Sequence, residues 1–432
     1  MRVAPAVGQP ASLDVWFGDA VVGRVFDTTP LAFEYAATWL LPKPAPMQIA
    51  SIPLRAGVQA DPSVTAFFEN LLPEGDLRST LFAASKTSSV YGLLRTTAGD
   101  TAGGFVLLPS GSRPAAHHYL PTTWAALAAG VPAASNAQPA TLAKTARQGV
   151  RISLAGAQRK FSVALFADGV PRMPQGTSPS THIVKPDITR IDGVWASAVN
   201  ETIIMRTAAL CGLGVAPVFY EPHTRACVVE RFDRYVDANA AANSAVQRIM
   251  QYDLCQLSNR PSSKKYEAEG GPSLKDCVDL VRKYSSVPAL DIKRLLTWVF
   301  FNLYTGNNDS HAKNLSLYSP PGQGVRLTPF YDLMCTRIYP GLSPSFAFDI
   351  GGTTLPGEVT GKHIADMAGQ IGIGPKFASG VANELVGKLP AALAQAVESI
   401  RPSLTPRDAT MASRLVTYEA RLARQTHKRM RD

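Results

Sequence analysis

Two carboxylates and one amide in the last third of the chain have the residue types and spacing that phosphoryl transfer requires. Asp309 and Asn314 stand five positions apart, and Asp332 ends the apolar run Leu-Thr-Pro-Phe-Tyr. One carboxylate can accept the proton of an attacking hydroxyl, while an amide oxygen and a second carboxylate hold the metal ion that bridges the phosphates. The pattern is short, and an ordinary polar turn is the alternative interpretation.

The same five-residue spacing separates Asp and Asn in the protein-kinase catalytic loop, H-R-D-L-x-x-x-N. The preceding segment, residues 290–304, has apolar residues at the spacing of one helical face. Gly306 follows this segment. We therefore expect a core helix over 290–304 that ends at Gly306 and leads the chain directly into the polar loop.

A second segment has the composition of a nucleotide-holding element. Residues 151–160 form a small-residue loop before the strand-like run 161–166, and Lys185 lies on a later strand-like run. In a kinase, backbone N–H groups of such a loop approach the phosphates and a strand lysine neutralises them. The loop has a single glycine, Gly156, so it does not match G-x-G-x-x-G. A solvated lysine at a strand end is the alternative for Lys185.

A helix is expected over residues 200–212, with Asn200 as its N-cap and Gly212 after its end. Glu201 in its first turn could pair with Lys185, or it could only favour the helix N-terminus electrostatically. Both interpretations remain open from the sequence.

The apolar run 226–232 is typical of a buried strand that ends in charge. In a kinase this segment meets the adenine base through backbone groups. We therefore assign Glu230, Arg231 and Phe232 to the expected nucleotide site.

Composition narrows the class of protein. The chain has 432 residues, 46% of them apolar, and two or three subdomains are expected from this length. No run of about 18 uncharged apolar residues is present, and the N-terminus lacks the apolar stretch of a secretory signal. The five cysteines are scattered and form no C-x-x-C pair. These features predict a cytoplasmic protein with reduced thiols, no structural zinc and no membrane partner.

The formal net charge is +10, and residues 414–431 carry six Arg or Lys against one Glu. A basic surface of this kind favours polyanionic partners. A solubilising basic surface explains the same excess equally well.

The remaining segments complete the predicted organisation. Gly18-Asp19 is the expected turn of a hairpin over 13–27. The predicted fold class is α+β, a bilobal protein-kinase-like fold whose N-terminal lobe is mixed α/β and whose C-terminal lobe is all helical. The expected domains are 1–112, an α/β subdomain; 113–149, a connector; 150–235, an ATP-binding lobe; and 236–432, a helical lobe with the catalytic loop. Other expected elements are strands over 31–35 and 101–109, a helix over 63–72, a surface loop over 236–247, and helices over 378–400 and 407–429.

In sum, the chain resembles the HipA-type bacterial serine/threonine kinases, which are toxins of toxin–antitoxin pairs. Seven motifs in chain order carry the resemblance, and each is weak on its own. They are Phe67-Phe-Glu-Asn-Leu-Leu-Pro73, Gly99-Asp-Thr-Ala-Gly-Gly104, Ile152-Ser-Leu-Ala-Gly-Ala-Gln158, Thr181-His-Ile-Val-Lys185, Val229-Glu-Arg-Phe-Asp-Arg234, Gly306-Asn-Asn-Asp-Ser-His-Ala-Lys-Asn314 and Leu327-Thr-Pro-Phe-Tyr-Asp332.

The resemblance implies a role for each motif residue. Asp309 is the implied catalytic base, Asn314 and Asp332 are the implied Mg²⁺ ligands, and Lys185 is the implied phosphate-neutralising lysine. Ser153 is also the implied autophosphorylation site. A phosphate adds about −1.5 to −2 charges at pH 7 and, on this loop, would disturb its ATP-binding shape. The remaining implied ATP contacts are Ser153, Leu154, Ala155, Gly156, Ala157, Gln158, His311 and Lys313.

The resemblance also implies partners: a small helix-turn-helix antitoxin, operator DNA bound through it, and a translation protein as substrate, typically an aminoacyl-tRNA synthetase. Arg159 departs from the acidic residue expected after Ala-Gly-Ala-Gln, which changes the charge of the loop. The sequence around Asp309 reads Asn-Asn-Asp-Ser-His, so the residues that flank Asp309 can also vary from the family pattern. Two alternatives stay open: a kinase of small-molecule hydroxyls, and a DNA co-repressor whose kinase site has decayed.

Overall fold

A computed structural model describes residues 10–41, 48–97, 99–130, 160–237 and 246–431. The chain divides into two compact units by its internal contacts. Unit 1 comprises Met1–Thr122, Ala137–Thr181 and Asp233–Ser263, and unit 2 comprises Thr123–Asn136, His182–Phe232 and Lys264–Asp432. The expected phosphate-binding loop and most of the expected connector lie outside the described residues.

Unit 1 contains a five-stranded sheet in the order β4-β3-β2-β1-β5. The predicted hairpin is confirmed: β1 (Ser12–Phe17) pairs antiparallel with β2 (Ala20–Phe26) across the Gly18-Asp19 turn. Gly18 has φ 55°, which a two-residue hairpin turn requires. The predicted strand over 31–35 is β3 (Ala32–Tyr35), and the one over 101–109 is shorter than expected, β5 (Val106–Pro109).

An aromatic cluster forms the core of unit 1. α2 (Pro62–Glu69) begins where Asp61 accepts a hydrogen bond of 2.8 Å from the Ser63 N–H. It is the helix predicted over 63–72, and it ends three residues before the expected end. Its buried face supplies two phenylalanines that meet rings of the sheet and of a later segment at centroid distances of 5.0–6.1 Å. The rings are Phe33, Phe67, Phe68, Phe105 and Tyr252.

Two motifs far apart in sequence meet in a buried charge cluster of unit 1. The Asp100 carboxylate accepts 2.9 Å hydrogen bonds from the guanidinium groups of Arg234 and Arg248, and Ser180 Oγ donates to it at 2.6 Å. All four side chains are buried or nearly so. Because their buried charges are paired, Asp100, Arg234 and Arg248 have a structural role in unit 1.

The expected surface loop over 236–247 is wrong at both ends. Two antiparallel strands, β12 (Arg234–Val236) and β13 (Val246–Arg248), occupy its ends. This pairing brings Arg248 within hydrogen-bond distance of Asp100. The other elements of unit 1 are α1 (Ala37–Leu40), β4 (Gln59–Ala60), α3 (Gly75–Ser85), α4 (Val90–Thr97), β6 (His118–Pro121), β7 (Phe161–Val163), β8 (Arg172–Gln175), β14 (Gln251–Asp253) and α8 (Leu254–Leu257).

Within unit 2, three strands in the order β10-β11-β9 carry the lysine of the expected site. β11 (Ala226–Glu230) lies between β10 (Val218–Glu221) and β9 (His182–Pro186), and both pairings are antiparallel. Lys185 stands opposite Cys227 in this register.

α7 (Ser197–Leu210) packs on these strands and is almost entirely buried along its first three turns. The prediction of Asn200 as its N-cap is wrong, because the helix begins three residues earlier and Ala196, at φ 47°, occupies the N-cap. The extra turn places Asn200 and Glu201 in the helix body, where their side chains bond to other segments.

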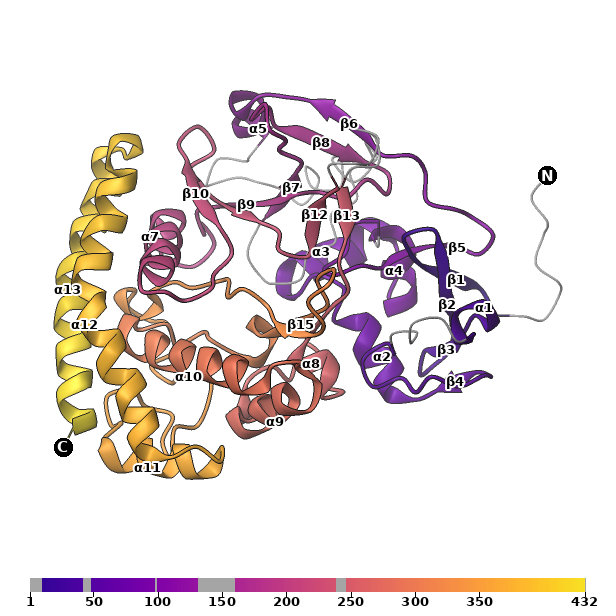
Figure 1. The fold of residues 1–432 in the computed structure, drawn as a ribbon. Helices are drawn as coiled ribbons and strands as arrows, with labels where there is room; N and C mark the ends of the chain where they lie inside the picture. The colour runs from indigo at the N-terminus through magenta and orange to yellow at the C-terminus, as the bar shows by residue number, and fades with distance from the viewer. Residues whose placement is uncertain (1–9, 42–47, 98, 131–159, 238–245, 432) are drawn as a thin grey trace. The chain divides into compact units, whose positions relative to one another are not determined.

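Long helices form the rest of unit 2 (Figure 1). α10 (Pro288–Thr305) is the predicted core helix; it begins with proline at N1 and ends at Gly306, which has φ 68°. It packs against α9 (Leu274–Tyr284), α12 (Pro375–Ile400) and α13 (Pro406–Arg431), and α7 packs against α12 and α13. The last two helices confirm the predictions over 378–400 and 407–429.

The expectation that everything after residue 236 is helical is wrong, because a short hairpin, β15 (Ser316–Tyr318) with β16 (Arg326–Leu327), follows the loop that carries Asp309. The other elements of unit 2 are α5 (Trp124–Gly130), α11 (Gly361–Gln370) and the 3-10 turns Glu267–Glu269, Ala312–Asn314, Thr336–Ile338 and Arg401–Ser403. Among the described residues, no helix combines the length and apolarity needed to cross a membrane.

Candidate active site

Lys185 lies at the centre of the candidate site, bonded to two carboxylates from distant parts of unit 2. Its Nζ is 2.6 Å from Oε1 of Glu201 on α7 and 2.7 Å from Oδ1 of Asp332. Lys185 and Glu201 are buried, whereas the Asp332 side chain is 43% exposed. The structure thus contains the Lys185–Glu201 pair that the sequence had left open, and the interpretation of Lys185 as a solvated lysine is wrong.

The two carboxylates keep the lysine charged. Burial alone would lower the pKa of Lys185, but the negative charges of Asp332 and Glu201 outweigh burial and hold this pKa above its ordinary value. Lys185 therefore stays protonated throughout the physiological pH range.

Asp332 has a left-handed backbone conformation, with φ 62°. Residues other than glycine seldom adopt it, and it costs about 1–2 kcal/mol. The segment after Asp332 is fixed by Asn200, whose amide group donates to the carbonyl of Cys335 and accepts from its N–H, both at 2.9 Å. Since Asn200 precedes Glu201 on α7, one helix holds both the lysine partner and the Asp332 segment. Sequence reasoning missed this role of Asn200.

Thr336 and Arg337 hold the start of the loop that carries Asp309. The carbonyl of Gly306 accepts from the Arg337 N–H at 3.1 Å and from Thr336 Oγ1 at 3.2 Å. Thr336 Oγ1 in turn accepts from the Asn308 N–H at 2.9 Å. The loop that carries Asp309 and the segment beyond Asp332 are therefore joined by hydrogen bonds.

Asp309 itself is open to solvent, with its side chain 55% exposed. Its backbone carbonyl accepts from Asn314 Nδ2 at 3.1 Å, which accounts physically for the five-residue spacing. Tyr266 donates its hydroxyl hydrogen to Oδ1 of Asp309, and its ring packs edge-on against His311 at 5.1 Å. Tyr266 lies 43 residues before Asp309, and no sequence signal pointed to it.

Tyr331 connects the two expected metal-binding segments. Its hydroxyl donates to the carbonyl of Lys313 at 3.0 Å, and that residue directly precedes Asn314. A 3.0 Å hydrogen bond also joins the hydroxyls of Tyr331 and Ser316. Since Asp332 follows Tyr331, these contacts hold the Asn314 segment beside the Asp332 segment. Lys313 and His311 are both buried.

The expected adenine-binding segment follows β11. Glu230 ends the strand and is exposed, and Arg231 is buried. The ring of Phe232 lies 5.3 Å from that of Tyr331 and 5.9 Å from that of Tyr318. An aromatic wall thus joins this segment to the residue before Asp332.

The donor set fits a magnesium ion bound with a nucleotide. Mg²⁺ prefers oxygen ligands and is commonly held by one or two carboxylates together with substrate phosphates. Asn314 and Asp332 supply an amide oxygen and a carboxylate. No group of three or more His, Cys, Asp or Glu residues suited to a metal occurs in the part of the chain that the structure describes.

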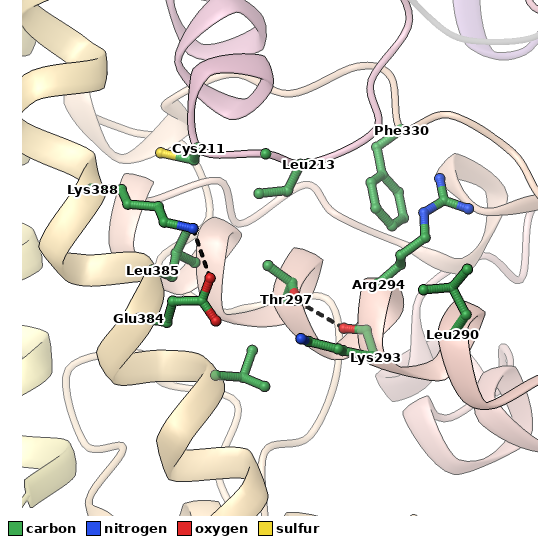
Figure 2. A pocket seen from close by; sticks show the side chains of 12 residues that line it. Cys211, Leu213, Leu290, Lys293, Arg294, Thr297, Phe330, Glu384, Leu385 and Lys388 are labelled. Atoms are coloured by element: carbon green, nitrogen blue, oxygen red, sulfur yellow. Dashed lines mark hydrogen bonds and ion pairs between the residues drawn. The ribbon is translucent and has the colours of Figure 1, made fainter.

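A cavity of about 230 Å³ in unit 2 is separate from this site (Figure 2). It lies between the end of α7, the side of α10 and α12, and none of the predicted site residues lines it. Figure 2 shows Glu384 and Lys388 paired across one turn of α12 and Phe330 on the opposite wall. Phe330, one of its lining residues, lies two residues before Asp332 in the chain.

The predicted loop residues Ser153, Leu154, Ala155, Gly156, Ala157 and Gln158 lie outside the described residues. The structure brings together Lys185, Glu201 and Asp332 by direct contact. It links Asp309, Lys313 and Asn314 to this group through the Tyr331 and Thr336 hydrogen bonds.

Comparison with known proteins assigns the family. The HipA-like C-terminal domain matches residues 152–393, which is more than half of the chain, and the HipA N-terminal domain matches residues 13–108. The chain belongs to the HipA family of serine/threonine-protein kinase toxins. Both matches agree with the seven sequence motifs, so the suspected resemblance is confirmed.

Relatives of known name cover nearly the whole chain. "Putative kinase Y4mE" of Sinorhizobium fredii is 36% identical over 89% of this chain and 92% of its own length. The serine/threonine-protein kinase toxin HipA of Shewanella oneidensis is 28% identical over 95% of this chain and 94% of its own. This HipA-family chain is therefore an enzyme of the protein serine/threonine kinase class, which uses ATP with a divalent cation.

The fold agrees with a solved HipA structure. Shewanella oneidensis HipA, in its complex with HipB and operator DNA, matches with a TM-score of 0.79 and 26% identity over 96% of this chain and 97% of that one. The α+β, kinase-like fold class predicted from the sequence is thus confirmed.

Proposed function

We propose that this HipA-family kinase transfers the γ-phosphoryl group of ATP to a serine or threonine hydroxyl, with Asp309 as catalytic base. One observation carries the proposal: Lys185 bonds at once to Glu201 and Asp332, while Tyr331 and Thr336 join that group to the loop of Asp309 and Asn314. Such an arrangement is the one that phosphoryl transfer by positioning and electrostatics demands.

Each residue has a distinct task. Asp309 orients the substrate hydroxyl and accepts its proton as the new oxygen–phosphorus bond forms, and Tyr266 holds that carboxylate in place. Lys185 neutralises phosphate oxygens, and Glu201 keeps the lysine side chain aimed. Asn314 and Asp332 would hold Mg²⁺, which supplies charge neutralisation as the bond to the leaving ADP breaks.

The nucleotide contacts are proposed on both sides of this group. Glu230, Arg231 and Phe232 would flank the adenine, and the aromatic wall of Phe232 and Tyr331 supports that placement. His311 and Lys313 are proposed to stand near the phosphates. The proposed phosphate-binding loop is Ser153, Leu154, Ala155, Gly156, Ala157 and Gln158.

Incubation of the purified protein with Mg²⁺ and radiolabelled ATP tests the proposal. We expect label on the parent protein and none on Asp309→Asn. The matched control is Asp366→Asn, which changes an exposed carboxylate on α11 and should leave labelling unchanged. Equal labelling of Asp309→Asn and the parent would exclude Asp309 as the base. A parent protein that does not bind ATP would exclude the proposed nucleotide site.

Autophosphorylation at Ser153 is proposed as self-inactivation. The negative charge of a phosphate beside Arg151 and Arg159 would draw the loop out of its ATP-binding shape. Mass spectrometry should locate the label on Ser153, and Ser153→Ala should stay active for longer than the parent. A Ser153→Ala protein that loses activity as fast as the parent would contradict self-inactivation.

The proposed biological partners follow from the relative of solved structure, whose complex contains HipB and operator DNA. We propose that a helix-turn-helix antitoxin binds this chain and that the pair acts on operator DNA. The proposed substrate class is a translation protein such as an aminoacyl-tRNA synthetase, so that its phosphorylation arrests growth. Labelling of a cell extract by the parent but not by Asp309→Asn would identify that substrate.

A further inference from the structure

The outer side of α13, the last helix, presents an unbroken row of cations and hydroxyls. Eight of its residues are spaced alternately three and four apart, so they lie along one side of the helix. All eight are exposed. This set, called the α13 stripe below, is Arg407, Thr410, Arg414, Thr417, Arg421, Arg424, Lys428 and Arg431.

Among the described residues, the six cations of the α13 stripe form no ion pair, and only Arg407 lies close enough to a carboxylate, that of Asp187, to affect its pKa. The acidic residues of this helix, Asp408 and Glu419, both point into unit 2, where they are 0% and 4% exposed. None of the six cations lies within ion-pair distance of a carboxylate in the described chain. Arg407 and Arg414 instead lie over the ring of Trp195, at 5.6 and 5.5 Å, which orients them without cancelling their charge.

The residue types of the α13 stripe identify the chemistry of a partner. Arg, Lys and Thr side chains are the usual donors to phosphate oxygens of nucleic acids. A stable protein–protein interface would instead need an apolar or aromatic centre from which charges are depleted. Within Pro406–Arg431, all large apolar side chains are at least partly buried. Beside the stripe is a hollow of about 620 Å³, lined partly by Arg414, Arg421 and Arg424. A ligand in this hollow could contact these donors.

The geometry favours a duplex over a single strand. Proteins that bind single strands present exposed aromatic rings for base stacking. Here Trp195 is covered by two guanidinium groups, and Tyr418 is half-buried beneath the guanidinium of Arg421. From residue 407 to residue 431 the straight helix extends about 36 Å at 1.5 Å per residue. That length is close to one turn of B-form DNA, about 34–36 Å.

We propose that the α13 stripe binds the phosphate backbone of double-stranded DNA without regard to sequence, along about one turn. The choice of DNA as the duplex rests on the proposed function, in which this kinase acts on operator DNA with an antitoxin. The polyanion site itself rests only on the charge and geometry of α13. Binding here would add affinity and hold the protein on the duplex, while base recognition would belong to another protein.

Titration of a fluorescent DNA duplex of roughly 20 base pairs with the full-length protein at several salt concentrations tests the proposal. We expect log Kd to depend linearly on log salt, because each neutralised phosphate contributes a slope of roughly 0.9. The triple variant Arg414→Gln/Arg421→Gln/Arg424→Gln should lower that slope by about 3 and weaken binding more than roughly 10-fold near 0.1 M salt.

The matched control removes the same charge elsewhere in unit 2. Lys283→Gln/Lys362→Gln/Lys376→Gln changes three exposed lysines of other helices and should leave slope and affinity close to those of the parent. An equal loss in the control would overturn the proposal, since net charge alone would then explain binding. Absence of DNA binding by the parent, tighter binding to duplex RNA, or equal competition by poly-glutamate would each overturn it too.

Kinase labelling on the same preparations separates this inference from the proposed function. The α13 stripe lies outside the group of Lys185, Asp309 and Asp332, so the triple variant should label with ATP at the parent rate and show the parent circular dichroism spectrum. A parent that binds DNA but never labels would contradict the kinase mechanism alone. A parent that labels but shows no stripe-dependent binding would contradict the α13 proposal alone.

Discussion

At the scale of single residues, the site depends on pairs that fix a charged group in one orientation. Asp309 is more than half exposed, so packing alone does not hold its side chain. Tyr266 supplies the constraint through its hydroxyl hydrogen bond to Oδ1. The proposed base is therefore oriented by a residue, Tyr266, that belongs to none of the seven sequence motifs.

Replacement of this tyrosine should lower turnover without affecting nucleotide binding. A hydrogen bond to a charged group contributes about 1.5–3 kcal/mol, so Tyr266→Phe should reduce kcat by roughly 10- to 100-fold. Steady-state labelling would show this loss in kcat with the KM for ATP unchanged. Tyr284→Phe, at the end of α9, is the matched control and should behave as the parent. A Tyr266→Phe enzyme with the parent kcat would show that Asp309 needs no such brace.

Glu419 is a buried carboxyl on the inner face of α13 and makes stability depend on pH. Burial raises the pKa of Glu419 well above its ordinary value of 4.5, although a hydrogen bond from Cys335 and the charge of Arg337 lower it. The folded protein therefore keeps a proton that the unfolded chain releases above about pH 4.5. Stability from this group is present below that pH and is lost as pH rises toward the folded-state pKa.

Glu419→Gln removes this titration while it keeps the size of the side chain. Relative to the parent, its free energy of unfolding should rise between pH 5 and pH 8, by at most about 1.4 kcal/mol per pH unit. Urea denaturation at three pH values measures the difference. The control Glu398→Gln changes an exposed carboxylate and should show a flat difference. A flat difference for Glu419→Gln would mean that the carboxyl is ionised in the folded state.

At the scale of elements, the end of a helix positions the loop that carries Asp309. α10 is buried along most of its length and stops at Gly306, from which the loop with Asp309 starts. The left-handed conformation of Gly306, with φ 68°, turns the chain, and its carbonyl accepts the hydrogen bonds that brace the loop. The turn and the brace therefore share one residue.

Gly306→Ala should destabilise the protein and slow catalysis together. An added Cβ would lie 2.9 Å from Cδ2 of Leu422 and 3.2 Å from Cβ of Arg337, in a conformation that costs a side chain about 1–2 kcal/mol. We expect a lower melting temperature and a lower kcat, measured by calorimetry and ATP labelling. Gly357→Ala, where nothing lies within 4 Å of the new Cβ, is the control. Parent-like values for Gly306→Ala would show that the loop relaxes freely.

At the scale of the whole molecule, the fold holds its thiols without disulfides. All five cysteines are free and buried. Burial raises the pKa of Cys211 to about 11 and the pKa values of Cys227 and Cys335 well above the ordinary range. Protonated, shielded thiols are poor nucleophiles, because the thiolate is the reactive form.

Thiol labelling of the native protein should therefore be slow, and all five thiols should react at once after denaturation. A reducing agent should leave the melting temperature unchanged. Ellman's reagent with and without guanidinium, together with calorimetry in dithiothreitol, measures both effects. Fast reaction of a thiol in the native protein at pH 8 would show that local opening of the fold readily exposes that cysteine to solvent.

The sequence was sufficient for features whose chemistry is local. Asp309 and Asn314 belong to one loop, and their spacing is set by a hydrogen bond within that loop, so the pattern is visible without the fold. The hairpin at Gly18-Asp19 and the C-terminal end of α10 at Gly306 were predictable for the same reason, since turn and cap residues act on their immediate neighbours.

Tertiary structure alone decided the contacts between distant segments. Three such contacts depend on strand pairing and helix packing, which no local pattern encodes. They are the Lys185–Glu201 ion pair, the hydrogen bonds of Asn200 with Cys335, and the hydrogen bond from Tyr266 to Asp309. The prediction of Asn200 as a cap failed because burial extended the helix beyond its local start signal. The α13 stripe likewise needed the fold, because only packing determines which side of a basic helix faces solvent.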